Sequence, residues 1–150
     1  MIHELHRSHV TDIVELLRIL RAESPEYNYV DDDPVWVANN MDGLIQNATL
    51  VGVVSEDDDA HVTGFMIGFV SHTWYSKRVD AMEQLLYVHP LYRGGSLAPR
   101  LIKRFEELCR TKGAFELSVG ASTGMAEERT VKLYKHMGYT ERSPTLVKRL

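Results

Sequence analysis

The chain has 150 residues, a formal net charge of −4 and 44% hydrophobic residues. This size and composition predict one domain, residues 1–150, with a core of its own. The negative balance argues against a nucleic-acid partner, which needs a basic face. No run of about 18 apolar residues occurs, so we expect no membrane span. The N-terminus lacks a basic-then-apolar signal and the lone Cys109 has no disulfide partner within the chain, so we expect a cytoplasmic protein.

Two helices follow a short first strand in the N-terminal part of the chain. Residues 2–7 alternate weakly between apolar and polar side chains and suit an edge strand. A stripe of apolar residues then predicts a helix that ends near residue 22 and is capped by Ser8 or Thr11. After a polar loop, Asp33 is the expected cap of a second helix, with Pro34 at its first position and its end near residue 46.

Strands dominate the middle of the chain, and helices alternate with strands after it. The expected strands cover residues 48–55, 62–75, 78–88, 115–120, 139–142 and 145–148, and the later helices cover residues 97–113 and 126–137. Gly64 and Gly68 inside the second of these strands indicate a bulge or a close neighbour. Three consecutive strands imply an antiparallel meander, and the later strand–helix–strand step implies a parallel neighbour. The sequence therefore predicts an α/β (α+β) fold with a central mixed sheet of about six or seven strands, flanked by about four helices.

The stretch from Ala81 to Gly113 organises the rest of the chain. Its strand ends at Pro90, a turn rich in glycine and serine follows at residues 93–96, and apolar residues then recur at helical spacing. The first N–H groups of a helix lack intrahelical partners, and glycines allow a phosphate to approach them closely. These features predict a pyrophosphate cradle at residues 93–98. Neither G-x-x-x-x-G-K-[ST] nor G-x-G-x-x-G is present, so we expect neither a nucleotide P-loop nor a dinucleotide fold.

Two segments of the chain resemble motifs of one enzyme family. Residues 88–98, VHPLYRGGSLA, resemble the acetyl-CoA loop of the GNAT-type N-acetyltransferases, V-x-P-x-Y-R-G-x-G-x-G/A, with Ser96 where the family usually has glycine. Residues 133–139, LYKHMGY, resemble the family's L-Y-x-x-x-G-[FY], and Glu127 stands where the family often has asparagine. The order of the expected elements is similar to the GNAT fold along the whole chain.

The resemblance implies acetyl-CoA as the cofactor, which would act as a co-substrate. The residues implied in its binding are Leu86, Tyr87, Val88, Arg93, Gly94, Gly95, Ser96, Leu97, Ala98, Pro99 and Glu127. In the family, the strands that correspond to residues 78–88 and 115–120 splay apart, and the pantetheine arm enters the gap. The resemblance also assigns polarisation of the thioester carbonyl to backbone N–H groups near residues 86–88.

The same resemblance implies direct acetyl transfer to an amine in a ternary complex. It assigns protonation of the departing thiolate to Tyr134. Glu83 lies close to the place where many family members carry a catalytic glutamate. Adjacent strand residues face opposite sides, so the base could be Glu83 or Gln84, and a water chain, His72 or Asp80 are further alternatives. No H-E-x-x-H or paired-cysteine pattern occurs, so we expect no metal.

The acceptor side is expected in the loop that follows the first long helix. In the family this loop often borders the acceptor site, which makes Tyr27, Tyr29, Asp32 and Trp36 candidate substrate-binding residues. The acidic run at residues 31–33 would attract an ammonium group. The expected partner is a small-molecule amine or a peptide, and a homodimer is possible. Two alternatives stay open: a catalytically silent acyl-CoA-binding or regulatory module of the same fold, and an anion-binding domain for another nucleotide.

Overall fold

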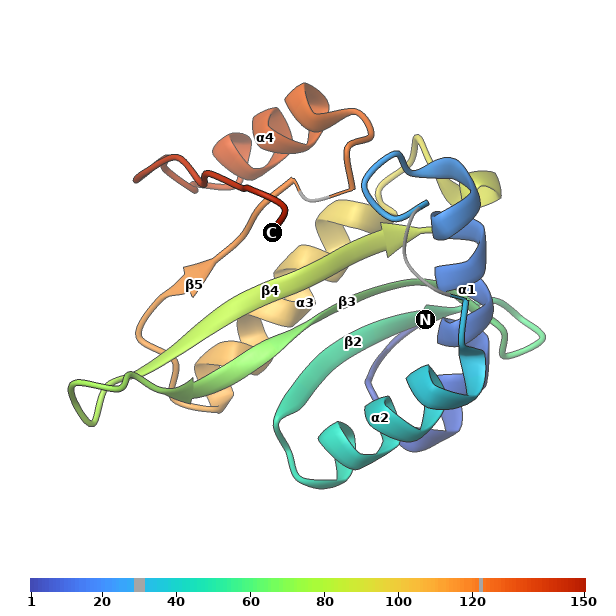
Figure 1. Ribbon diagram of the computed structural model, residues 1–150, viewed down its shortest axis with the longest axis horizontal. Coiled ribbons are helices and arrows are strands. Elements are labelled where there is room, and N and C mark those ends of the chain that lie inside the picture. Colours follow the sequence, from blue (N-terminus) through green and yellow to red (C-terminus); the bar gives the residue numbers. More distant parts are fainter. Residues whose placement is uncertain (29–31, 122) are drawn as a thin grey trace.

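The computed structural model describes residues 1–28, 32–121 and 123–150, which form one sheet with helices on both of its faces (Figure 1). The strands of the sheet are β1 (Ile2–Glu4), β2 (Leu50–Glu56), β3 (Val62–His72), β4 (Val79–Val88) and β5 (Leu117–Ser118). The helices are α1 (Val10–Glu23), α2 (Pro34–Gln46), α3 (Leu97–Thr111) and α4 (Glu127–His136), together with the short 3-10 turns η1 (Arg7–His9) and η2 (Pro90–Tyr92).

The sheet has the predicted mixed topology. Strands β1 to β4 pair antiparallel in chain order, and β5 joins β4 in parallel, with Ala81 opposite Leu117. The predicted count of about six or seven strands is wrong, because the described residues form a sheet of five. Residues 139–142 and 145–148 form no strand. In the second of these segments Leu146 and Val147 are 90% and 88% exposed, so no layer covers its apolar side chains.

Each face of the sheet has its own hydrophobic core. On one face, α1 and α2 pack on the sheet around fully buried residues such as Leu20 and Phe65. On the other face, α3 crosses the sheet, and Phe105 and Leu101 lie fully buried beside Tyr134 of α4 (Figure 1). The predicted mixed α/β architecture with helices on both faces is therefore confirmed. In the described part of the chain, no helix is both long and apolar enough to cross a membrane.

The helix starts show which sequence signals decided local structure. Asp33 caps α2 by accepting a hydrogen bond from the Trp36 N–H at 3.0 Å, and Pro34 takes the first position, as predicted. The predicted cap of the first helix is wrong. The 3-10 turn η1 precedes α1, and His6 caps that turn by accepting a hydrogen bond from the Ser8 N–H at 3.3 Å. The backbone is therefore already helical where α1 begins.

A bulge between β3 and β4 sets which side chains of β4 face each core. Ile67 pairs with Leu85 and Gly68 pairs with Glu83, so Gln84 is the extra residue on β4. A Cβ atom at Gly68 would lie 2.4 Å from a β4 carbonyl oxygen, which explains why only glycine fits there. The bulge turns Glu83 toward the α3 face and Leu85 toward the α1 face, and it leaves Gln84 exposed.

Candidate functional site

A cavity of about 300 Å³ opens between the end of β4, the loop before α3, and α4. Its lining residues are Leu86, Tyr87, Val88, Tyr92, Arg93, Gly94, Gly95, Ala98, Pro99, Thr123, Met125, Ala126, Arg129, Thr130 and Leu133. Most of the predicted coenzyme-binding residues therefore meet at one place. Ser96, in the same loop, and Leu97, the first residue of α3, do not line the cavity, and Glu127 borders a second hollow beside the start of α4.

The loop before α3 presents backbone to the cavity. Gly94 has a φ of +86°, a conformation that side-chain-bearing residues rarely adopt, and a Cβ atom at Gly94 or Gly95 would meet no heavy atom within 4 Å. Ser96 is the N-cap of α3, but its side chain makes no capping hydrogen bond, and Pro99 has no N–H to satisfy. The first turn of α3 therefore offers open N–H groups and the positive end of the helix dipole beside the cavity.

Arg93 lines the cavity while its guanidinium is held from behind. The Nε–H donates to the Val88 carbonyl at 2.8 Å, and both terminal nitrogens contact the Glu23 carboxylate, with Nη1 at 3.1 Å. The guanidinium also lies over the Tyr87 ring, 5.3 Å from its centroid. Arg93 thus fixes the loop to the end of β4. The sequence predicted this guanidinium as a donor to a pyrophosphate, and in the structure it is already paired with a carboxylate.

The free edge of β4 forms the wall opposite α4. β5 pairs with β4 at Ala81 and Met82, and further along β4 the cavity takes the place of the next strand at residues 86–88. On the other side, residues 86–88 remain paired with β3. This arrangement matches the predicted gap between the splayed strands, where backbone groups of β4 border the space.

Glu83 lies buried where β4 and β5 diverge. Its exposed fraction is 8%, and Oε2 accepts a hydrogen bond from the Gly120 N–H at 3.0 Å. Burial raises the pKa of the Glu83 carboxyl to about 7, while hydrogen bonds from the backbone of Gly120 and Leu86 act in the opposite direction. A carboxyl with such a pKa can exchange a proton near neutral pH. Gln84, its predicted alternative, is exposed on the bulge.

Tyr134 of α4 lies in the core below the cavity wall. It is 4% exposed, and its hydroxyl is one of the buried side-chain atoms in the described residues that find no hydrogen-bond partner. Its ring packs edge-on against Tyr139, with centroids 5.2 Å apart. Burial raises the pKa of the Tyr134 phenol, and the charge of Glu83 adds to the shift, so the hydroxyl stays protonated at neutral pH.

Sequence reasoning missed the part of the cavity that the β5–α4 segment supplies. Thr123 and Met125 come from an irregular loop with no periodicity, and Arg129 is an exposed residue in the first turns of α4. The signal that could have found Arg129 is its place two residues after Glu127, which the resemblance had implied in coenzyme binding.

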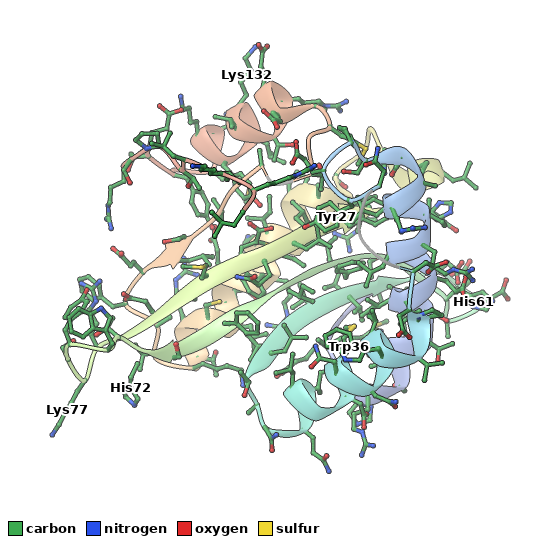
Figure 2. The ribbon with its side chains drawn as sticks, in the orientation of Figure 1. Tyr27, Trp36, His61, His72, Lys77 and Lys132 are labelled. Atoms are coloured by element: carbon green, nitrogen blue, oxygen red, sulfur yellow. The ribbon has the colours of Figure 1, made fainter. Side chains whose placement is uncertain are left out.

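The predicted acceptor residues that the structure describes do not line the cavity. Tyr29 falls outside the described residues, and Tyr27, Asp32 and Trp36 do not line the cavity. Asp32 lies 3.5 Å from Arg18, and Trp36 is 62% exposed on α2, whereas Tyr27 packs against the core on the α1 face. Figure 2 shows Tyr27 near the end of β4 and Trp36 lower on α2. The structure therefore does not bring this set together.

The two other candidate bases lie at the far end of the β3–β4 ribbon. The His72 Nδ1 atom is 2.8 Å from the Lys77 carbonyl oxygen, and Asp80 pairs with Arg78 at 2.8 Å. Figure 2 shows His72 and Lys77 at the hairpin end of the molecule, while the cavity opens at the other end of β4. Neither His72 nor Asp80 lines it. Within residues 1–28, 32–121 and 123–150, no three His, Cys, Asp or Glu side chains gather as a metal site.

Comparisons with known proteins agree with the fold and motifs. Residues 31–141 match the family model of the acetyltransferase (GNAT) domain. An acetyltransferase from Agrobacterium fabrum is 28% identical over 91 residues, which cover 61% of this chain and 59% of that relative. The solved structure of a Trypanosoma brucei acetyltransferase superposes with a TM-score of 0.77 at 20% identity, over 100% of this chain and 99% of that one. Glucosamine-6-phosphate N-acetyltransferase from Arabidopsis thaliana gives 0.76 at 15% identity, over 99% and 97%.

Proposed function

Because the chain belongs to the GNAT acetyltransferase family, we propose that it moves an acetyl group from acetyl-CoA to a primary amine by direct transfer in a ternary complex. The observation that carries this proposal is the cavity between β4 and α4. One end of the cavity meets the open N-terminus of α3, and its α4 wall belongs to the helix that bears the unpaired Tyr134 hydroxyl.

The residues present fit acetyl-CoA, which supplies the acetyl group as a thioester. The glycines at 94 and 95 leave the loop open to a diphosphate, and the first N–H groups of α3 and the Arg93 guanidinium would bind it. Leu86, Val88 and Leu133 give the cavity apolar walls suited to a pantetheine arm. The buried Tyr134 hydroxyl lacks an acceptor that a sulfur atom would provide.

The chemistry that these residues would perform is proton transfer and charge stabilisation. When the amine nitrogen bonds to the acetyl carbon, a backbone N–H within residues 86–88, other than that of Leu86, which already donates to Glu83, would stabilise the charge on the carbonyl oxygen. The carbon–sulfur bond would then break, and Tyr134 would donate its proton to the sulfur. The second proton that the new amide nitrogen loses would restore the Tyr134 phenol. We assign removal of the ammonium proton to Glu83, because its pKa of about 7 suits a base at neutral pH.

The acceptor class we propose is a primary amine of a small molecule or of a protein. Structural neighbours of this chain include an aminoglycoside acetyltransferase, glucosamine-6-phosphate N-acetyltransferase and ribosomal-protein-alanine N-acetyltransferase. These names span an aminoglycoside, an amino sugar phosphate and a ribosomal protein, and the group that they share is an amine. We therefore propose to test the acceptor with a panel of amines that represents each of these classes.

Calorimetry and a thiol-release assay test this function. We expect coenzyme A to bind and ATP to bind far more weakly, because the cavity combines a diphosphate site with an apolar arm. In the presence of acetyl-CoA, a panel of an amino sugar, an aminoglycoside, a polyamine and an N-terminal alanine peptide should yield free thiol with at least one member. No heat with millimolar coenzyme A would refute the proposal. Coenzyme binding without thiol release from any amine would favour a silent binding module.

A further inference from the structure

Glu23 breaks a local rule of helix construction. It is the last residue of α1, where the negative end of the helix dipole disfavours a carboxylate. Its exposed side-chain fraction is 27%, so solvent compensates only in part. A residue placed against local preference and half-buried indicates a role in the tertiary structure or in a site. Its partners come from the end of β4 and from the loop that follows it.

The partners of Glu23 belong to the cavity wall. Its carboxylate accepts a hydrogen bond from the Tyr87 hydroxyl at 2.5 Å and contacts both terminal nitrogens of Arg93. These contacts hold the pKa of Glu23 below its usual range, with Arg93 as the largest cause, so the carboxylate is charged at neutral pH. Arg93 and Tyr87 line the cavity, whereas Glu23 lies behind them. The cation that faces the cavity therefore carries its own counter-ion.

We propose that Glu23 is a resident counter-ion of Arg93, which weakens the binding of coenzyme A and acetyl-CoA alike and so keeps the coenzyme exchangeable. This inference rests on the proposed function, because it assumes that a diphosphate binds beside Arg93. Glu23 is a positioning residue, since it acts on the coenzyme through Arg93. A diphosphate in the cavity and Glu23 compete for one guanidinium fork, and the carboxylate charge also repels the phosphates.

Two opposing effects decide the sign of a Glu23 substitution. Loss of the carboxylate would free Arg93 to move, which costs ordering entropy when the diphosphate binds. Loss of the charge would remove repulsion between the carboxylate and the phosphates. The Arg93 Nε–H keeps its bond to the Val88 carbonyl, and a glutamine at position 23 still accepts from Tyr87, so little order is lost. Charge therefore dominates, and Glu23→Gln should tighten coenzyme binding about threefold to tenfold.

The test is calorimetry with coenzyme A and with acetyl-CoA on the wild-type chain and on matched variants. Glu23→Gln should lower both dissociation constants by the same factor, and Glu23→Asp, which keeps the charge, should stay within about twofold of wild type. Glu15→Gln is the control, because it removes the same charge from an exposed position about two turns earlier on α1. It should leave both constants unchanged.

Salt separates a charge effect from a structural one. The gain from Glu23→Gln should shrink when sodium chloride rises from about 0.05 M to about 0.5 M, because salt screens the repulsion. Equal or weaker binding by Glu23→Gln, or a gain that salt does not reduce, would overturn the inference. Failure of the wild-type chain to bind either coenzyme would instead refute the proposed function, and the inference with it. The melting temperature of each unliganded variant verifies that it is folded.

Discussion

Replacement of Tyr134 by phenylalanine is expected to stabilise the protein while it slows the reaction. The Tyr134 hydroxyl is buried, lies in a residue only 4% exposed, and lacks a partner in the described structure. A buried polar group without a partner costs about 1–3 kcal/mol. Its removal should therefore raise the free energy of unfolding by about 1 kcal/mol, which corresponds to a melting temperature about 2–4 °C higher.

The same substitution removes the proposed proton donor. General acid catalysis is worth about a hundredfold to ten-thousandfold, and a thiolate is a weakly basic leaving group, so we expect a loss of turnover near the lower end, about a hundredfold. The dissociation constant of coenzyme A should stay within about twofold, because the hydroxyl would meet the coenzyme at its sulfur atom alone, while the residues that line the cavity would make the other contacts. Urea unfolding, thiol release and calorimetry measure the three quantities.

Tyr139→Phe is the matched control for Tyr134→Phe. The Tyr139 hydroxyl donates to Glu106 at 2.8 Å, so its loss should cost about 1 kcal/mol of stability and leave turnover intact. Unchanged turnover in Tyr134→Phe would remove Tyr134 from the chemistry. A fall in the stability of Tyr134→Phe would mean that its hydroxyl is satisfied in the free protein, and the argument from an unpaired donor would then fail.

Three further predictions concern the carboxyl, the bulge and the α4 wall. The folded-state pKa of Glu83 is raised to about 7, so between about pH 4.5 and pH 7 the carboxyl is protonated in the folded state and ionised in the unfolded state. The free energy of unfolding should therefore fall by on the order of 3 kcal/mol as pH rises through this range. Glu83→Gln should abolish this pH dependence in urea titrations. Gly68→Ala should lower the free energy of unfolding by about 1–3 kcal/mol, because its Cβ would lie 2.4 Å from a carbonyl oxygen. Gly43→Ala, which has open space around it in α2, should raise the free energy of unfolding by up to about 1 kcal/mol. Equal urea midpoints for the two variants would contradict this prediction. Arg129→Gln should weaken coenzyme A binding about threefold to tenfold in calorimetry, while Lys132→Gln, whose side chain points away from the cavity in Figure 2, should not; equal effects would exclude a specific contact.

Features with a strong local signal could be predicted from the sequence. The helix expected at residues 97–113 is α3 (Leu97–Thr111), and the organising strand expected at 78–88 is β4 (Val79–Val88). Both have a one-sided or continuous apolar pattern that matches their burial. Gly68 in the middle of a strand indicated a bulge or a close neighbour, and the structure has both at this position.

Features that depend on tertiary contacts could not be predicted. The contact between Arg93 and Glu23 joins residues 70 positions apart, and nothing in either neighbourhood encodes it. The strand expected at 115–120 is only Leu117–Ser118, because the chain leaves the sheet where the Gly120 N–H turns to Glu83. The strands predicted at residues 139–142 and 145–148 do not form for a related reason. Alternation of apolar and polar residues does not make a strand where no neighbouring strand pairs with it.

The short pairing of β5 divides the molecule into a stiff part and a compliant part. β5 joins the sheet at Ala81↔Leu117 and Met82↔Ser118, and beyond it α4 is attached through side chains such as Tyr134 and through the Ser24 hydroxyl, which donates to the Thr123 carbonyl. A wall fastened by packing can loosen without breaking the backbone ladder of the sheet. Amide hydrogens of α4 should therefore exchange with solvent before those of β2 to β4. A ligand that binds against α4 must also order this helix, and the entropy cost of that ordering lowers the net free energy of binding.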